Sequence, residues 1–268
     1  FYEINLNKLR QDENFLKAVL AIEKALVSLQ IDYYLIGALA RDMWFQGVND
    51  IKPKRATSDI DFAILLQNKS VFDQLKKYLI EKEGFSEYKE NPYVLIAPNK
   101  IEIDLLPFGE IEEDGKVVVS GTGMTTILVD GLNEVYNSNI PVVNIEDKIS
   151  FKVCPLAGIV LLKLIAYDDR PESRVHDLTD IADIFKYYFT INDSEIWENH
   201  SDLFIDEMSL EFISARVIGR EIGKILESNL KLKDRIISLL NSDENKNFSM
   251  ISQTIALHLN NRIFNSII

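Results

Sequence analysis

The chain has 268 residues, 47% of them hydrophobic and 26% charged, which is the composition of a globular protein with one large or two modest domains. Its formal net charge of −13 at pH 7 opposes indiscriminate binding to nucleic acid, although a local basic patch could still hold an RNA substrate. The single cysteine excludes an internal disulfide, and the longest apolar run, residues 157–166, is too short to cross a bilayer. We therefore expect a cytoplasmic protein without membrane association.

The first predicted elements are a helix, a strand and a second helix. Apolar residues recur at three- and four-residue steps over 12–29, with Asp12 as a cap, which predicts an amphipathic helix. A β-rich run over 31–36 ends at Gly37, and residues 38–45 again favour a helix. A strand that passes through glycine into a helix presents free backbone N–H groups to a phosphate. The alternative is that Gly37 only makes a tight turn.

An acidic strand is predicted over residues 56–64. Side chains alternate along a strand, so Asp59 and Asp61 share one face, with Cα atoms roughly 7 Å apart. Paired carboxylates suit a hard cation such as magnesium or manganese. The alternative is a strand end whose acids face water. The preceding basic connection, residues 47–55, could receive phosphates or be a solvated loop.

A third carboxylate lies on a later strand. After a helix predicted over 70–82 with Ser70 as its cap, two strands are predicted over 93–97 and 101–106 as a hairpin. Glu102 and Asp104 share a face of the second strand, which we expect to lie beside the acidic strand. Short apolar stretches and glycines up to residue 153 predict turns and edge strands.

Helices dominate after Pro155. Residues 156–167 are apolar except for Lys163, and a buried ammonium needs an anionic partner. That partner is either a nucleotide or, alternatively, Asp177 or Asp180, which we place on the exposed side of the next helix. Arg170 shares the side of Lys163 if the first helix persists that far. Further amphipathic helices are predicted over 207–228, 232–241 and 247–264.

Two groups of motifs together resemble a known family. The Gly37-Ala38 pair, the Asp59/Asp61 strand and Asp104 resemble nucleotidyltransferases of the DNA polymerase β superfamily. The downstream residues Lys163, Arg170, Arg174, Asp177 and Asp180 resemble the helical motifs of AbiEii-type toxin nucleotidyltransferases. The resemblance runs from about residue 33 to 188, and the last 80 residues look like a helical extension.

The resemblance implies an α+β fold. Residues 1–150 would form a nucleotidyltransferase-like catalytic domain with a mixed sheet and flanking helices, and residues 151–268 a helical domain that completes the nucleotide site. The implied activity is metal-dependent transfer of NMP from an NTP to a hydroxyl acceptor, which is RNA such as tRNA, protein or a small molecule. The implied context is the toxin of a toxin–antitoxin or phage-defence pair, with a cognate antitoxin as partner.

The resemblance also implies roles for individual residues. Asp59, Asp61 and Asp104 would hold Mg²⁺ or Mn²⁺, with Asp104 also acting as the base, and Lys163 and Asp177 would support catalysis. The implied nucleotide-binding residues are Gly37, Ala38, Arg41, Arg55, Ser58, Lys163 and Arg170. Ala38 departs from the glycine or serine common at its position, and His176 stands where these toxins often have lysine. Two alternatives remain open: a catalytically inactive binding module, and an enzyme that modifies antibiotics.

Overall fold

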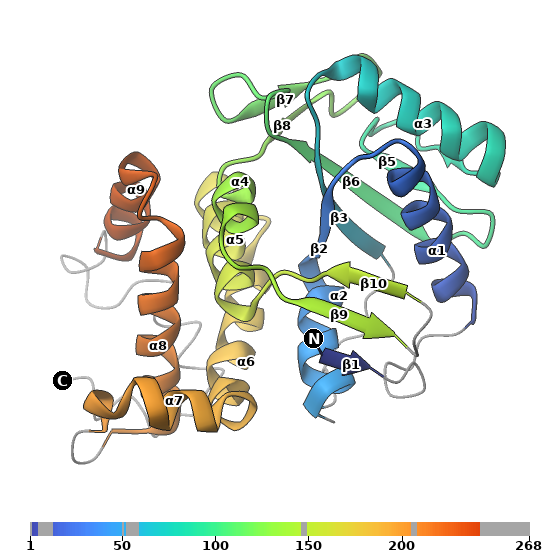
Figure 1. Ribbon diagram of the computed structural model, residues 1–268. Helices are drawn as coiled ribbons and strands as arrows, with labels where there is room; N and C mark the ends of the chain where they lie inside the picture. The colour runs from blue at the N-terminus through green and yellow to red at the C-terminus, as the bar shows by residue number, and fades with distance from the viewer. Residues whose placement is uncertain are drawn as a thin grey trace. The chain divides into compact units, whose positions relative to one another are not determined.

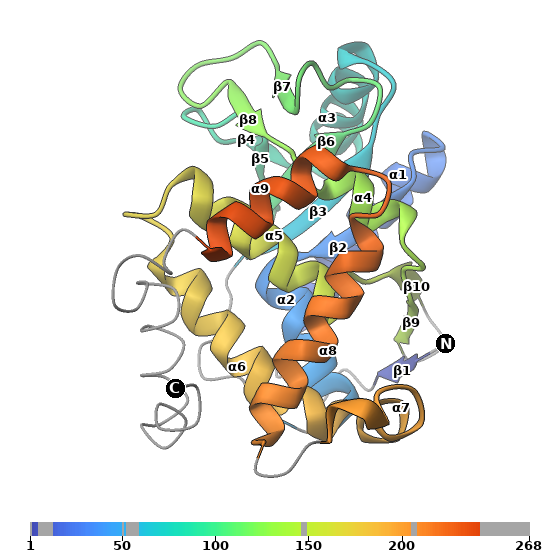
Figure 2. The same cartoon turned by 90° about the vertical axis from the view of Figure 1, so that its left-hand side faces the viewer.

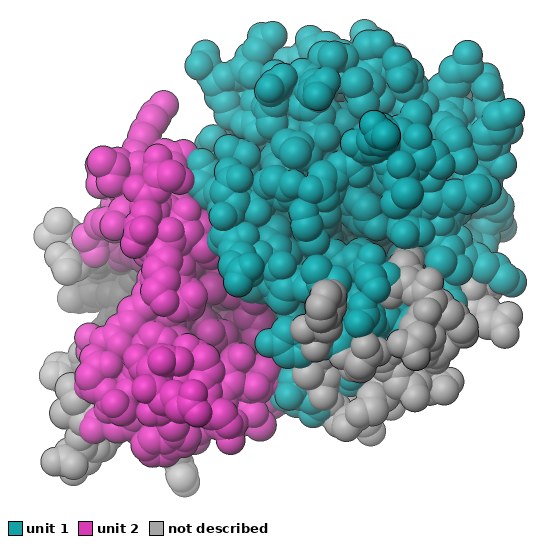
Figure 3. All heavy atoms as spheres, in the orientation of Figure 1, with its two compact units in different colours: residues 1–155 teal, residues 156–268 magenta. Residues whose placement is uncertain are grey.

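The computed structural model describes residues 2–4, 13–49, 51, 59–145, 149–204 and 208–241. Contacts within the chain divide it into two compact units, residues 1–155 and 156–268, which Figure 3 distinguishes by colour. Over the described residues, the strands lie in unit 1, whereas unit 2 is built of helices.

A five-stranded mixed sheet forms the centre of unit 1 (Figure 1). Its strands, in spatial order, are β2 (Tyr33–Ile36), β3 (Asp59–Leu65), β6 (Glu102–Phe108), β5 (Val94–Ile96) and β4 (Ser86–Glu87). The parallel pair is β3 with β6, and every other neighbouring pair in this sheet is antiparallel. This confirms the predicted α+β class with a mixed sheet, as well as the hairpin of β5 with β6.

Two long helices accompany this sheet. Helix α1 (Glu13–Ser28) and helix α3 (Lys69–Glu83) contact each other and lie side by side in Figure 1. The apolar positions that predicted the first helix, among them Val19, Ile22 and Leu26, are at most 2% exposed. The residues that recur every three to four positions therefore form the face of the helix that packs into the core.

The start of α3 corrects one prediction. Its cap is Asn68, whose side chain accepts a hydrogen bond from the backbone N–H of Val71, whereas Ser70 lies inside the helix. Both residue types favour caps, and the apolar pattern alone does not decide between positions two residues apart. The predicted cap Asp12 lies outside the described residues.

The helix after β2 is longer than expected. Helix α2 (Gly37–Asp42) continues as a π-helix over Met43–Val48, where a polar connection was predicted from Gly47 onward. Met43 and Phe45 are at most 2% exposed, and the indole N–H of Trp44 donates to the carbonyl of Cys154 at 2.8 Å. Gln46, the first residue beyond the predicted end, is also buried, so the packed part of the helix continues past residue 45.

The rest of unit 1 consists of short elements. β1 (Tyr2–Ile4), β9 (Val142–Ile145) and β10 (Ile149–Lys152) form a second sheet, and β7 (Lys116–Val118) pairs with β8 (Thr126–Leu128). Helix α4 (Leu132–Asn137), which was not predicted, precedes β9. The predicted edge strands over residues 107–153 are thus present as separate small sheets.

Unit 2 contains α5 (Leu156–Asp169), α6 (Val175–Ile191), α7 (Asp193–Asn199), α8 (Leu210–Ile225) and α9 (Leu230–Asn241). Helices α5, α6 and α8 pack against one another, and α9 packs against α5 (Figure 2). Helix α5 ends at Asp169, and the backbone N–H of Arg170 still donates to the carbonyl of Ala166 at 3.2 Å, so the helical turn reaches Arg170 at its very end. Helices α8 and α9 confirm two of the predicted segments, and the third, residues 247–264, lies outside the described residues.

Candidate active site

The acidic residues of unit 1 meet on two adjacent parallel strands. The register pairs Asp61 of β3 directly with Asp104 of β6, and Asp59 with Glu102. Paired residues of neighbouring strands point to the same face, and neighbouring strands lie about 4.8 Å apart. All four carboxylates therefore belong to one face. This confirms that the strand of Asp104 lies beside the acidic strand.

The opposite face of the same two strands is core. Ile60 and Phe62 of β3 and Ile103 and Leu105 of β6 are at most 1% exposed. The acidic face is less covered, because Asp59, Asp61 and Asp104 are half-buried and Glu102 is exposed. The alternation that sequence analysis used thus separates a buried apolar face from an accessible acidic one.

Gly37 lies against one of these carboxylates. The antiparallel register of β2 with β3 pairs Ile36 with Asp61, and the next residue, Gly37, has a φ of +71°. A Cβ atom on Gly37 would lie 2.0 Å from Oδ2 of Asp61. Only glycine therefore fits here, both because of its backbone conformation and because the Asp61 carboxylate occupies the space of a side chain.

The donor set of this face fits a hard divalent cation. Carboxylate oxygens on one face are the ligands that Mg²⁺ and Mn²⁺ prefer. Among the described residues, no three His, Cys, Asp or Glu side chains are already gathered closely enough to hold a metal ion. The backbone register places Asp61 and Asp104 opposite each other. Their side chains would have to rotate toward each other to bind one shared ion.

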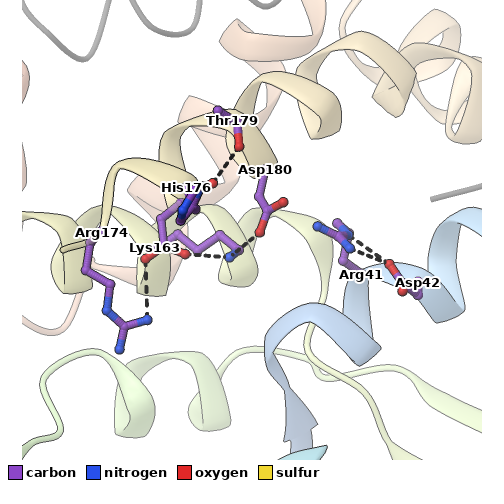
Figure 4. Close-up of polar contacts among 8 residues, drawn as sticks. Arg41, Asp42, Lys163, Arg174, His176, Thr179 and Asp180 are labelled. Carbon is purple, nitrogen blue, oxygen red and sulfur yellow. Dashed lines mark hydrogen bonds and ion pairs between the residues drawn. The ribbon is translucent and has the colours of Figure 1, made fainter. Parts of the chain in front are cut away.

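The other predicted nucleotide-binding residues of unit 1 differ in their surroundings. Ala38 is the second residue of α2. Arg41 is 3% exposed, and its Nε and Nη2 donate to Oδ1 of Asp42 at 2.9 and 2.7 Å (Figure 4). Sequence analysis did not identify Asp42 as the partner of Arg41, because the only indication was that the two residues are adjacent. Arg55 and Ser58 lie outside the described residues.

Lys163 forms a compact ionic cluster within unit 2 (Figure 4). Its Nζ donates to Oδ1 of Asp177 at 2.7 Å and to Oδ2 of Asp180 at 2.8 Å. The side chains of the lysine and of both aspartates are only 10–13% exposed. Lys163 thus binds both of the alternative partners that the sequence offered.

The placement of Asp177 and Asp180 on an exposed side of their helix is wrong. Helix α6 packs against α5 and α8, so that residues on several of its sides are buried. No described residue hydrogen-bonds the buried Oδ2 of Asp177, and Nη1 of Arg174 lies 3.6 Å from it. Arg170, in contrast, is exposed after the end of α5. The cluster concentrates negative charge around one ammonium group.

Comparison with protein families identifies the class. The model of the family described as "nucleotidyl transferase AbiEii toxin, Type IV TA system" matches residues 24–246. The chain is therefore a nucleotidyltransferase. It belongs to the AbiEii family, and the match continues through α8 and α9, which the motifs had suggested to be an extension.

Several solved structures resemble the chain more distantly. A solution structure of the antibiotic-resistance factor ANT(2'')-Ia has a TM-score of 0.39 and 12% identity, covering 87% of this chain and 98% of that one. The Thermotoga maritima CCA-adding enzyme complexed with tRNA has a TM-score of 0.33 and 13% identity, covering 98% and 71%. At these TM-scores the likenesses add no argument to the family match.

Two further findings are negative. No curated protein sequence matches the chain significantly. Over the residues that the structure describes, there is no helix with the length and apolar character needed to cross a bilayer.

Proposed function

We propose that the chain transfers NMP from an NTP to a hydroxyl acceptor with the help of Mg²⁺ or Mn²⁺, and that it is the toxin of a toxin–antitoxin pair. The observation that supports this most directly is the register of β3 and β6, which pairs Asp61 with Asp104 on the face that also carries Asp59. Membership of the AbiEii family supports the same chemistry.

The three aspartates have distinct proposed roles. Asp59 and Asp61 hold the divalent ions, and Asp104 completes their coordination and accepts the proton of the attacking hydroxyl. Bound divalent ions would neutralise charge on the phosphates and assist both nucleophile and leaving group. Gly37 lets the β2–α2 backbone come close to the phosphates, because the residue has no side chain to intervene. Ala38, Arg41, Arg55 and Ser58 are the other proposed nucleotide contacts of this part.

The helical part contributes a positioned cation. An ammonium group has three N–H donors, and Asp177 and Asp180 accept two of those of Lys163. We propose that the third donates to a phosphate oxygen of the nucleotide, while Asp177 holds the ammonium in place. Arg170, which is exposed, supplies a further contact to the nucleotide. In this proposal residues 1–150 form the catalytic domain and residues 151–268 complete nucleotide binding.

Labelled NTPs test the reaction. Wild-type protein incubated with each α-labelled NTP and Mg²⁺ or Mn²⁺ should release pyrophosphate and transfer label, and a chelator should stop both. Asp61→Asn and Asp104→Asn should each abolish transfer, whereas Asp73→Asn, which changes an exposed acid on α3, should keep it. Offering tRNA, protein extract and aminoglycosides separately identifies the acceptor class. Folded protein that binds no NTP with either metal would contradict the proposal.

A further inference from the structure

An exposed tryptophan stands out on the surface of unit 2. Trp197 of α7 is 55% exposed, whereas the other tryptophan of the chain, Trp44, is 6% exposed. Its indole ring stacks on Phe204 with ring centroids 3.8 Å apart and an angle of 6° between the planes. Phe189 packs edge-on against both rings at 6.3 and 6.1 Å. One face of the indole is therefore fixed by the protein, and its other face and rim meet solvent.

This ring lies in a strongly acidic stretch. Residues 193–207 contain six Asp and Glu residues and neither Lys nor Arg. Asp193, Glu195, Glu198 and Asp202 are exposed members of this stretch. Arg220 of α8 binds Asp202, with Nη1 donating to Oδ1 at 2.8 Å. Glu195 lies 3.3 Å from Nε2 of His200.

We propose that this surface, formed by Asp193, Trp197 and Glu198 and called here the Trp197 surface, docks a basic segment of a partner protein. An Arg or Lys side chain of the partner covers the open face of the indole as a cation–π contact, and neighbouring basic residues pair with Asp193, one helical turn before Trp197, and with Glu198. Tryptophan is among the residues most enriched at the centres of protein interfaces. The stack on Phe204 fixes the ring in advance, which lowers the entropy lost on binding.

Charge decides between the classes of occupant. Nucleic acid binds through neutralisation of its phosphates, which an acidic surface opposes. A second copy of the chain that used the same surface would bring like charges together. A basic protein segment is complementary in both charge and apolar contact. The proposal uses none of the residues assigned to catalysis, so it stands independently of the proposed function.

The test uses the full chain and a fluorescent short peptide of alternating arginine and alanine. Fluorescence anisotropy at low salt should show binding that Trp197→Ala weakens about tenfold, with Trp197→Phe in between because phenylalanine keeps the stack on Phe204. The double change Asp193→Asn and Glu198→Gln should weaken binding and flatten its salt dependence. Bound peptide should also shield Trp197 from acrylamide, a neutral quencher that hardly reaches the buried Trp44.

A matched control lies on unit 1. Tyr88 is 42% exposed, but Lys89 follows it and Lys76 binds the neighbouring Glu87 at 2.9 Å, so it offers an exposed aromatic ring without an acidic surrounding. Tyr88→Ala should bind the peptide like the wild type, and so should the catalytic variant Asp61→Asn. Equal binding by Trp197→Ala would overturn the proposal, as general attraction of opposite charges would then suffice. Shielding of Trp197 by an RNA oligonucleotide, or by self-association without peptide, would overturn it as well.

Discussion

Gly37 matters both for the fold, through its backbone conformation, and for the proposed chemistry, through its contact with Asp61. Gly37→Ala would place a Cβ 2.0 Å from Oδ2 of Asp61 and force alanine into a left-handed conformation. The left-handed backbone conformation costs alanine about 1–2 kcal/mol of stability, and the Asp61 carboxylate must also move. We expect nucleotidyl transfer to be lost while the protein still folds, as measured by pyrophosphate release and urea unfolding.

Gly84 provides the matched control. It ends α3 with a φ of +74°, close to that of Gly37, but a Cβ atom added to it would have Cγ of Pro98 as its nearest neighbour, at 3.5 Å. Gly84→Ala should therefore lose a similar amount of stability and keep full activity. Equal loss of activity in both variants would mean that instability, and not displacement of Asp61, explains the effect.

Lys163 allows a second test at the scale of single residues. Lys163→Met removes the cation that binds Asp177 and Asp180 and leaves two buried carboxylates without it. We expect a loss of about 3–5 kcal/mol in the free energy of unfolding, since removing one partner of a buried ion pair leaves charge without its counterion. Adding Asp177→Asn and Asp180→Asn to Lys163→Met should restore much of this stability without restoring activity. A triple variant as unstable as Lys163→Met would contradict this explanation.

The residues of the two clusters were not equally predictable. The period of a strand is two, so the shared face of Asp59 and Asp61 follows directly from the sequence, and the parallel pairing of β6 with β3 brings Asp104 to that face. Helical periodicity shows which residues share a side, but not how many neighbouring helices cover it. For this reason the burial of Asp177 and Asp180 between packed helices was missed.

At the scale of elements, removing the proposed cap of α3 tests where this helix begins. Asn68→Ala removes the side-chain oxygen that accepts from the N–H of Val71, and such a loss typically costs about 1 kcal/mol. Ser70→Ala, two residues later, should change stability by only a few tenths of a kcal/mol. Urea unfolding of both variants measures the difference. A larger loss of stability in Ser70→Ala than in Asn68→Ala would mean that Ser70 is the cap.

A polar link between elements makes the stability of unit 1 depend on pH. Asp32, just before β2, accepts hydrogen bonds from Nζ of Lys152 on β10, at 2.8 Å, and from the hydroxyl of Tyr136 on α4. Burial alone would raise the pKa of Asp32, but these hydrogen bonds outweigh it and lower the pKa. Burial also acts to lower the pKa of Lys152, and the hydrogen bond to Asp32 reverses this and raises it.

The sign of the pH effect follows from these directions. Asp32 contributes stability above its ordinary pKa of 3.8, and this contribution is lost as the pH falls through its lower folded value. Lys152 contributes below its ordinary pKa of 10.5 and loses its contribution as the pH rises through its higher folded value. Because solvent still reaches both half-buried side chains and weakens their pair, we expect Lys152→Met to cost about 0.5–1 kcal/mol at neutral pH and almost nothing in strong acid. Urea unfolding at both pH values checks this, with Lys77→Met, which changes an exposed lysine of α3, as control.

Local pattern predicted the long helices and several strands but missed the short helices α4 and α7. Helices α1, α3, α5 and α6 each span three turns or more, which is long enough for apolar periodicity to repeat. Helices α4 and α7 have six and seven residues, too few for a repeating pattern. The pairing of β1 with β9 joins distant parts of the chain, and nothing local in either strand indicates it.

For the whole molecule, the sequence predicted strands followed by helices because β-rich runs give way to helical periodicity near Pro155. The structure divides into compact units between Pro155 and Leu156. Composition also determines the sign of the electrostatic field: with a net charge of −13, an NTP is attracted only if cations offset the acidic residues around its site. Binding of a nucleotide should therefore depend on divalent metal, even apart from catalysis.

Thermal unfolding of the whole chain tests this dependence. A ligand that binds only the folded state stabilises it by about 2.7 kcal/mol at a hundredfold excess over its Kd, which raises Tm by several degrees in a protein of this size. We expect NTP with Mg²⁺ to raise Tm, and NTP with a chelator to leave it unchanged. Asp61→Asn should remove the shift, because one carboxylate of the pair with Asp104 is lost, and Asp73→Asn should retain it. A shift of equal size without metal would mean that the nucleotide is held by basic residues alone, and the aspartates of β3 and β6 would then need another role.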